Sequence, residues 1–397
     1  MTDSYPIYMD YHATTPVDPR VLDAMMPFFN QTFGNAASVD HLYGNTAQQA
    51  VERSREVIAG AIGARDPAEI VFTSGATESD NIALVGIAEA YAHKGNHIIT
   101  TAIEHKAILD TIEYLGGKGI RSTVLPVDRF GMVDPKSVEN AITEETILVS
   151  IMFANNEIGT IQPIREIGRI TRERRVFFHT DAAQAVGHIP VNVEEMNIDL
   201  MSFTAHKLCG PKGIGALYVR RRRPRVKPAP VIHGGGHERG IRSGTLNVPG
   251  IVGFAKALEI AEVEMDEESR CHFDWTEWMF KEFQAGIDGI ERNGHPTQRL
   301  PHNLNVFIPG IESRALVLDL NQIVAFSTGS ACTTANVEPS HVILALGFGE
   351  GRSYSSLRFG IGKFISKDDV VYVTKQVVSA TRKLIDRFGL ISGVGRF

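Results

Sequence analysis

The sequence predicts an α/β protein whose main domain is built on a largely parallel β-sheet. Between about residues 68 and 220, short apolar runs rich in β-branched residues alternate with longer helix-like stretches, the order expected of strand–helix units. Several of the short runs are apolar almost throughout, as in strands that helices cover on both faces. The chain has 397 residues, of which 43% are apolar. It is therefore long enough to bury a large core without disulfides.

Seven strands and the helices between them can be placed from this alternation. The strands are expected at residues 69–73, 98–101, 123–126, 147–153, 176–179, 200–203 and 216–219. The helix-like segments between them include residues 78–94, 105–116 and 164–174. A glycine-rich segment, HGGGHERGIRSGT, interrupts the pattern at residues 233–245, and a helix from residue 248 to about 283 and a second mixed section follow it. We therefore place a domain boundary near residues 260–265.

Composition and charge exclude several classes of protein. The net charge is −6, from 40 basic and 46 acidic side chains, so no general attraction to nucleic acid or anionic membranes is expected. The first fifteen residues hold no apolar segment and no apolar run approaches about 18 residues, so neither a signal peptide nor a membrane span is expected. The three cysteines lack CxxC spacing, which argues against a disulfide framework or a cysteine-based metal site and favours the reducing cytoplasm.

The basic run RRRRPRVK at residues 220–227 carries six positive charges in eight positions. One interpretation is a solvated turn that follows a strand. The other is a docking patch for an acidic partner or for RNA.

Three motifs at the ends of predicted strands bring complementary chemistry to one edge of the sheet. SGATES, residues 74–79, follows a strand and opens a helix, so its free backbone N–H groups and the Thr77 hydroxyl predict an anion site. Asp181 follows the apolar strand VFFH and, once buried, needs a cationic partner such as a protonated ring nitrogen. Lys207 follows the strand that ends in FTAHK, where burial lowers the pKa of a lysine and makes its amine a nucleophile toward carbonyl groups. A phosphate cradle, a pyridinium partner and a carbonyl-binding lysine are the three anchors of pyridoxal phosphate, so a site for this cofactor is predicted.

Cys332 lies in STGSACTTAN, residues 327–336, where small and hydroxyl side chains predominate. This composition favours an exposed loop, and a buried structural cysteine is the alternative. No Lys, Arg or His lies between residues 327 and 339, so nothing nearby in the sequence favours ionisation of the thiol. We expect deprotonation to come from the assembled site, with His105 or the bound substrate as the base. Cys209 and Cys271 are expected to have no catalytic role.

Nine segments, taken in order and spacing, resemble the cysteine desulfurases of the IscS/NifS group, which are fold-type I pyridoxal-phosphate enzymes of the class V aminotransferase family. They run through nearly the whole chain: YMDYHATTPVDPRV, FTSGATESDN, EHKAILD, NNEIGTIQPI, HTDAAQAVG, SFTAHKLCGPKGIGALYVRR, HGGGHERGIRSGT, TGSACTTANVEPSHVILALG and SSLRFGIGKF. The resemblance implies a large cofactor-binding domain, residues 17–262, with a mostly parallel seven-stranded sheet flanked by helices. It also implies a smaller α+β domain, residues 1–16 and 263–397, that carries the Cys332 loop, and it implies a homodimer.

The resemblance further assigns roles around the cofactor ring. Lys207 binds the cofactor covalently, and Asp181 keeps its pyridine nitrogen protonated. His105 lies over the ring and assists proton transfers. Gln184 hydrogen-bonds the ring oxygen, and Asn156 helps to position both cofactor and substrate.

Other residues of the resembled motifs bind the phosphate and the substrate. The phosphate contacts implied within one subunit are those of Ala76, Thr77, Thr204 and His206. Thr245 reaches the phosphate from the other subunit. Arg358 holds the substrate carboxylate as a bidentate fork, for which a guanidinium suits better than an ammonium.

The implied reaction removes sulfur from L-cysteine and leaves L-alanine and a persulfide on Cys332. The sulfur then passes to an acceptor protein, either an iron–sulfur scaffold or a thiolation enzyme. Cys332 transiently contacts an iron–sulfur cluster in the first case, and no other metal site is expected. The chain ends soon after residue 390, whereas longer relatives use an extended tail to dock the scaffold, so that docking mode is in question. The alternatives are a selenocysteine lyase or an aminotransferase on the same scaffold, or a sulfur-relay protein whose activity depends on a partner.

Overall fold

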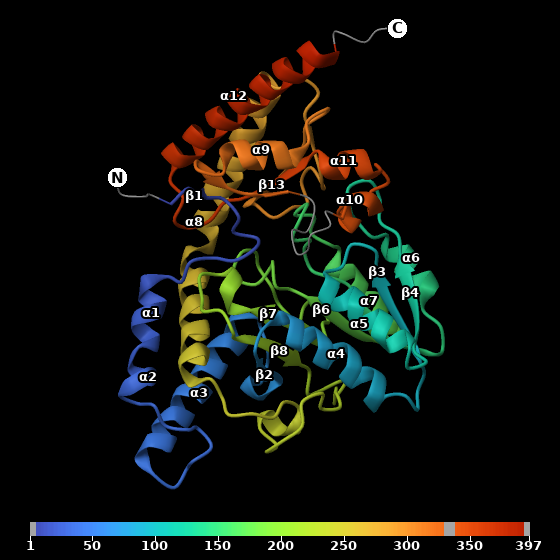
Figure 1. The fold of residues 1–397 in the computed structure, drawn as a ribbon. Helices are drawn as coiled ribbons and strands as arrows, with labels where there is room; N and C mark the ends of the chain where they lie inside the picture. The colour runs from blue at the N-terminus through green and yellow to red at the C-terminus, as the bar shows by residue number, and fades with distance from the viewer. Residues whose placement is uncertain (1–4, 329–337, 393–397) are drawn as a thin grey trace.

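A computed structural model describes residues 5–328 and 338–392, with side chains to residue 387. Its largest element is a seven-stranded sheet with the strand order β2-β8-β7-β6-β5-β3-β4 (Figure 1). The strands of this sheet are β2 (Ile70–Thr73), β3 (His97–Thr101), β4 (Arg121–Leu125), β5 (Thr146–Ser150), β6 (Phe177–Asp181), β7 (Leu200–Thr204) and β8 (Gly215–Val219). Within the sheet, β8 is antiparallel to both of its neighbours and the remaining pairs are parallel. The predicted α/β fold with a mostly parallel sheet is thereby confirmed.

Helices cover both faces of the sheet because its buried side chains alternate between two apolar clusters. Leu148, Leu200 and Leu217 belong to the cluster that includes the buried face of α4. Val149 and Met201, one residue further along two of these strands, belong to the cluster on the opposite face. The helices of this part are α1 (Pro19–Met25), α2 (Pro27–Asn30), α3 (Leu42–Ala61), α4 (Ala76–Ala90), α5 (Lys106–Gly116), α6 (Pro135–Ala141), α7 (Ile164–Arg174) and the first half of α8 (Val248–Gly286).

The ends of several elements differ from the sequence-based expectation. The edge strand β4 begins at Arg121, two residues earlier than expected, because its first residues are polar and exposed and so give no apolar signal. The strand β5 ends at Ser150, although the buried apolar run continues to Phe153. The helix α4 begins at Ala76, directly after the turn that follows β2.

A second, smaller unit carries its own apolar core above the first (Figure 1). It has a four-stranded antiparallel sheet, in the order β12-β13-β10-β9, and a parallel pair, β1 and β11. Its elements are β1 (Ile7–Tyr8), β9 (Glu291–Arg292), β10 (Asn303–Phe307), α9 (Ser313–Leu320), β11 (Val324–Ala325), β12 (Ser327–Thr328), α10 (His341–Ala345), α11 (Glu350–Tyr354), β13 (Ser356–Gly360) and α12 (Lys367–Ser392). None of the helices within the described ranges is long and apolar enough to cross a membrane.

The two units are joined by α8 and by the N-terminal segment. Phe254 and Leu258, in the first half of α8, lie in the core of the larger unit, whereas Met279 and Phe283 lie in the core of the smaller one. Met9 also belongs to the smaller core. The chain then crosses to the larger unit before α1 begins, so residues 12–15 lie between the two. The division at residues 262 and 263 stays a prediction.

The basic run that follows β8 is not wholly solvated. Arg220 is buried, and its guanidinium lies 2.6 Å from Glu194 Oε1 and 3.2 Å from Asp199 Oδ1. The expectation of a solvated run is therefore wrong at its first residue, which is part of the fold. Arg222, Arg223 and Arg225 are exposed.

A buried ion pair fixes the glycine-rich segment against the sheet. Arg55 of α3 donates two hydrogen bonds to Glu238, of 2.8 and 2.9 Å, and a third of 2.7 Å to the carbonyl of Ile70. Glu238 Oε2 also accepts the backbone N–H of Phe72 at 2.8 Å. Both charged side chains are at most 3% exposed. Because every charge here has a close partner, loss of one side chain leaves the other charged and unpaired in the interior.

We expect Glu238→Ala to lower the free energy of unfolding by roughly 3–5 kcal/mol, the cost of breaking a buried ion pair on one side. The measurement is urea denaturation followed by circular dichroism. The matched control is Glu173→Ala, which removes an exposed pair with Arg169 four residues away and should change stability by no more than about 0.5 kcal/mol. Equal effects of the two substitutions would contradict the assignment.

Candidate active site

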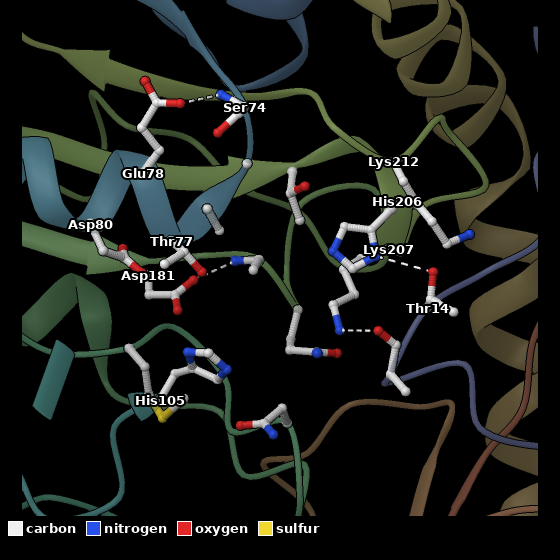
Figure 2. A pocket seen from close by; sticks show the side chains of 18 of the residues that line it. Thr14, Ser74, Thr77, Glu78, Asp80, His105, Asp181, His206, Lys207 and Lys212 are labelled. Carbon is white, nitrogen blue, oxygen red and sulfur yellow. Dashed lines mark hydrogen bonds between the residues drawn. The ribbon is translucent and has the colours of Figure 1, made fainter. Parts of the chain in front are cut away.

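A cavity of about 510 Å³ opens at the edge of the sheet where β2, β6 and β7 end. These three strands run in the same direction, so their carboxyl ends meet at this edge, the usual place for ligands in such sheets. The wall is completed by the first turn of α4, the loop after β5 and the N-terminal crossing segment (Figure 2). The polar and charged residues of the lining are Thr14, Ser74, Thr77, Glu78, Asp80, His105, Asn156, Asp181, Gln184, Thr204, His206, Lys207 and Lys212.

Lys207 projects into this cavity from η2 (Ala205–Lys207), the short turn that follows β7. Its amine donates hydrogen bonds to the carbonyl oxygens of His12 and, at 2.8 Å, Ala13. Burial, together with the positive charge of Arg358, lowers the pKa of Lys207 to about 8, while nearby carboxylates act in the opposite direction. At a pKa of about 8 roughly a tenth of the amine is uncharged at pH 7, far more than for an ordinary lysine, and a nucleophilic lysine requires the uncharged form.

Asp181 lies across the cavity from Lys207 (Figure 2). Its Oδ1 atom accepts the backbone N–H of Ala183 at 2.9 Å. Burial raises the pKa of Asp181, and the positive charges nearby partly offset that effect. Burial raises the pKa of the neighbouring Asp80 well above its usual value, and the negative charge of Asp181 raises it further. Two adjacent buried carboxyl groups do not both ionise easily, and burial raises the pKa of Asp80 more strongly than that of Asp181, so Asp181 gives up its proton more readily than Asp80.

Asp80 has no cation to balance it among the described residues. The nearest basic nitrogen is His179 Nε2, 3.6 Å from Asp80 Oδ1. Burial lowers the pKa of His179 to about 3, so this ring is neutral. A neutral His179 does not stabilise a negative charge on Asp80, so it does not oppose the raised pKa of that carboxyl group.

The first turn of α4 forms the anion-binding wall of the cavity. Gly75 precedes the helix, and no side chain in the described part of the chain caps its N-terminus. The N–H groups at the start of the helix are therefore available to a ligand, and the helix dipole favours a negative one. Glu78 lies in the same turn, where it accepts the N–H of Ser74 at 2.7 Å and pairs with Arg242 at 2.7 Å. The arginine compensates the negative charge of Glu78.

His105 caps α5 and is positioned by its own backbone. The N–H of Ala107 donates to His105 Nδ1 at 3.1 Å. Because Nδ1 accepts a hydrogen bond, the proton of the neutral ring lies on Nε2, which is the atom that the ring can offer to the cavity. The preceding residue, Glu104, is fully buried, and its carboxylate accepts from Thr101 Oγ1 at 2.6 Å and from the N–H of Met152 at 3.0 Å. Burial raises the pKa of Glu104 to about 8.

Arg358 lies in β13, at the junction of the two units, and is not part of the cavity lining described above. Its guanidinium donates to Asp10 Oδ1 at 2.6 Å, to Ser327 Oγ at 3.1 Å and to the carbonyl of Asn156 at 2.9 Å. A carboxylate, that of Asp10, thus already occupies one side of the guanidinium. The Nε atom of Arg358 is buried and has no acceptor among the described residues.

The structure brings most of the predicted site together. The predicted residues that line the single cavity are Ala76, Thr77, His105, Asn156, Asp181, Gln184, Thr204, His206 and Lys207. Thr245 is exposed and lies outside this lining, and Cys332 lies outside the described residues. Cys209 is buried, which raises its thiol pKa to about 11, and Cys271 is exposed. What each residue does for a cofactor stays a prediction.

Several residues of the site were not predicted from the sequence. Asp80 follows Thr77 by three residues and therefore lies on the same face of α4, a signal that helical spacing offers. Lys212 of the GPKG turn could have been found from its proximity in sequence to Lys207. Asp10 and His12 had no such signal, because their partners Arg358 and Gln184 are 348 and 172 residues away.

The residues present fit pyridoxal phosphate. The uncapped N-terminus of α4 suits a phosphate, the half-buried amine of Lys207 suits an aldehyde carbon, and the carboxyl group of Asp181 suits a protonated ring nitrogen. The cavity volume of about 510 Å³ is ordinary for a small-molecule site.

Comparisons with known proteins agree with this arrangement. The family model described as aminotransferase class-V matches residues 7–373. A cysteine desulfurase IscS from Anaeromyxobacter sp. (strain Fw109-5) is 52% identical over 379 residues, which cover 96% of this chain and 93% of that protein. A cysteine desulfurase IscS from Rickettsia massiliae (strain Mtu5) is 48% identical over 380 residues, covering 96% and 92%.

Solved structures show the same fold. A NifS-like protein superposes with a TM-score of 0.87 at 39% identity, covering 94% of this chain and 98% of the other. A structure described as SspA in complex with cysteine superposes with a TM-score of 0.80 at 38% identity, covering 89% and 98%.

We expect the reaction of Lys207 with an aromatic aldehyde to accelerate with pH and to reach half of its maximum near pH 8, because only the uncharged amine attacks. The product is trapped with borohydride and quantified by peptide mapping. Lys256, whose side chain is 39% exposed, reports in the same map how the reagent itself responds to pH. A Lys207 profile that still rises steeply above pH 10 would show an amine with an ordinary pKa.

Proposed function

The chain belongs to the aminotransferase class-V family, and we propose that it is a pyridoxal-phosphate-dependent cysteine desulfurase that converts L-cysteine to L-alanine. One observation carries the proposal. A half-buried lysine amine, a buried carboxyl group and an uncapped helix N-terminus face one another across one cavity. The relatives that share this chain's length and about half of its sequence are named cysteine desulfurases. The selenocysteine lyase and aminotransferase alternatives have no comparable support.

The cavity residues would hold the cofactor at both of its ends. Lys207 would bind its aldehyde carbon, Asp181 its ring nitrogen, and the first turn of α4, with Thr204 and His206, its phosphate. Bound in this way, pyridoxal phosphate supplies an electron sink that stabilises negative charge at the α-carbon of an amino acid. Burial, and the charges of Lys207 and Lys212, lower the pKa of His206 to about 4, so this ring binds as a neutral group.

Two residues of the chain are placed to move protons. Lys207 Nζ, with a pKa of about 8, can take up a proton near neutral pH and give it back once it is free of the cofactor. His105 can donate from Nε2 because the N–H of Ala107 occupies Nδ1. The nearby Glu104 contributes to that arrangement from outside the cavity, since its carboxylate fixes the loop on which His105 begins the helix.

Arg358 would bind the substrate carboxylate by exchanging partners. Its guanidinium is already ion-paired with a carboxylate, that of Asp10, at 2.6 Å. The carboxylate of a substrate can replace Asp10 or accept a hydrogen bond from the free Nε of Arg358. Because the guanidinium is already removed from water, substrate binding adds little to its desolvation cost. Asn156, whose carbonyl accepts from Arg358, links this subsite to the cofactor cavity.

Cys332 would be the sulfur acceptor. Its thiolate attacks the sulfur of cysteine, an S–S bond forms, and the C–S bond breaks with its electron pair passing to the carbon side. Protonation of that carbon yields alanine, and Cys332 is left as a persulfide, so no external oxidant is needed. The small and hydroxyl residues around Cys332 in the sequence, and the family resemblance of that segment, support this assignment.

We also propose a homodimer in which Thr245 completes the phosphate site of the partner subunit. Large apolar side chains are exposed along the segment from α2 to the start of α3, among them Phe33 at 62% and Leu42 at 78%. Exposure of this kind is unfavourable for an isolated chain and supports a covered face. Thr245 is exposed and outside the cavity of its own subunit, which agrees with a role toward a second copy.

The sulfur would leave the enzyme for an acceptor protein, either an iron–sulfur scaffold or a thiolation enzyme, in the cytoplasm. The name IscS of the relatives supports an acceptor of this kind. The sparse cysteines, without CxxC spacing, support a reducing compartment.

We expect the wild-type enzyme to release equimolar alanine and sulfide from L-cysteine in the presence of a thiol reductant, and Cys332→Ala to release neither at a measurable rate. The bound-cofactor absorbance should be the same in both, because the thiol is not a cofactor ligand. Cys271→Ala, which removes an exposed thiol, is the matched control and should retain full activity. Normal turnover by Cys332→Ala would refute the assignment of the sulfur acceptor, and cofactor binding without any cysteine turnover by wild type would refute the proposed substrate.

We expect His105→Gln to lower kcat by about 10²–10⁴-fold, the contribution of a positioned proton-transfer group. Glutamine keeps a donor in the cavity but cannot exchange a proton. The cofactor content of the purified variant serves as the control for binding. A variant with full kcat would show that Lys207 alone moves the protons.

A further inference from the structure

His12, in the segment that crosses between the two units, contacts both sides of the candidate active site. Its backbone carbonyl accepts hydrogen bonds from Lys207 Nζ and, at 3.1 Å, from Gln184 Nε2. Its ring nitrogen Nδ1 lies 2.9 Å from Gln184 Oε1. The His12 side chain is 1% exposed, and the residue is outside the cavity lining, behind Gln184.

These contacts determine which nitrogen of His12 carries the proton. An amide oxygen only accepts hydrogen bonds, so the His12 nitrogen that faces Gln184 Oε1 must be Nδ1–H. Nε2 is then the lone-pair atom, and it has no donor within the described residues. Burial, and then the positive charge of Arg358, lower the pKa of His12 well below its usual value, so the ring is neutral.

The same contacts determine the orientation of the Gln184 amide. The two hydrogen bonds to His12 use the amide oxygen and one of the two amide hydrogens. A flipped amide would turn its oxygen toward the carbonyl of His12 and its NH₂ group toward Nδ1–H, which opposes acceptor to acceptor and donor to donor. The remaining amide hydrogen belongs to a residue that lines the cavity.

We propose that His12 is a positioning residue, whose Nδ1–H fixes the side-chain amide of Gln184 so that the second N–H of that amide is offered to the cofactor in the cavity. The proposal rests on the proposed function, in which Gln184 hydrogen-bonds the oxygen of the cofactor ring. His12 itself touches neither substrate nor cofactor. It acts through Gln184.

The surroundings of His12 hold the ring in place without competing for Nδ1. Its ring stacks on His302 at a centroid distance of 4.5 Å, and His302 stacks on His188 at 4.2 Å. Burial lowers the pKa of both of these histidines, so the stack is neutral. The charged groups that face it are Lys207 and Arg358. Both oppose protonation of His12 and so keep the ring neutral.

The consequence can be measured on the bound cofactor. A hydrogen bond donated to the ring oxygen competes with the proton that the oxygen shares with the lysine nitrogen, so it lowers the pH at which that proton is lost. Removal of the donor should raise the midpoint of the visible absorbance titration of the cofactor-loaded enzyme. One hydrogen bond corresponds to a shift of about one pH unit.

The test compares two substitutions that separate the donor from the stack. His12→Phe keeps a ring to stack on His302 but has no N–H, and we expect its midpoint to rise by about one unit. His12→Asn loses the stack but places an amide N–H near the position of Nδ1, and we expect its midpoint to stay within about 0.3 of wild type. A purely structural role predicts the reverse order, with His12→Asn the more disturbed variant. His302→Phe, which alters the same stack without touching Gln184, is the matched control and should titrate as wild type.

A double-variant cycle tests the route of action. Gln184→Ala should raise the midpoint by a similar amount, and His12→Phe should add nothing to it in the double variant. Additive shifts, or a normal midpoint in His12→Phe, overturn the proposal. If His12→Phe does not fold, ¹⁵N NMR of histidine-labelled wild type, with His12→Asn to assign the signal, decides the question. A protonated Nε2 on His12 overturns the proposal, and a protonated Nδ1 supports it.

Different results would refute the proposed function and the role of His12. A wild-type protein that binds no pyridoxal phosphate, or that binds it without turning over cysteine, refutes the proposed function. A wild type that binds, titrates and turns over, beside a His12→Phe variant that titrates in the same way, refutes only the role of His12.

Discussion

The candidate active site depends on holding a basic and an acidic side chain, Lys207 and Asp181, in one cavity without joining them as an ion pair. Lys207 donates to the carbonyl oxygens of His12 and Ala13 rather than to a carboxylate, and Asp181 takes its hydrogen bond from the backbone. Both charges are therefore held by neutral groups, and each can be given to a ligand without first breaking a salt bridge. A ligand that binds both groups would have to compete with a direct ion pair between them.

The separation of Lys207 from Asp181 follows from the way in which their two strands end. Asp181 ends β6 and Lys207 follows the adjacent parallel strand β7, and the backbones of the two strands are fixed to one another in register from His179 to Asp181. The strand β6 ends on the carboxylate itself, whereas β7 ends three residues before the amine and continues into a short turn. The turn carries the lysine away from its neighbour, and the N-terminal segment of the chain then supplies the carbonyl groups that receive it. The fold thus keeps two reactive groups close but unpaired through backbone geometry alone.

The sequence allowed the sheet and most of the cavity to be predicted because both depend on local order. Apolar strands, the SGATES turn, Asp181 and Lys207 each follow from a few neighbouring residues and from the rule that parallel strands present their carboxyl ends together. The contacts that complete the site connect residues far apart in the chain, so no local sequence pattern predicts them. Arg358 is the clearest example. Its chemistry suggested a substrate carboxylate, but only the folded chain shows that Asp10 already supplies one. For Arg220 the local pattern was misleading. It begins a run of basic residues that is typical of exposed chain, yet in the fold it is ion-paired with Glu194 and Asp199.

The continuous helix α8 fixes the position of the smaller unit relative to the larger one. It is rooted in the larger core through residues such as Phe254 and in the smaller core through Phe283. An α-helix turns by about 100° and advances about 1.5 Å with each residue. A single residue gained or lost in its middle would therefore swing the smaller unit, together with Arg358, about a quarter of a turn around the helix axis. Substitutions on the exposed face of α8 leave the relative orientation of the two units unchanged, whereas an insertion or deletion preserves it approximately only when its length is close to a multiple of 3.6 residues.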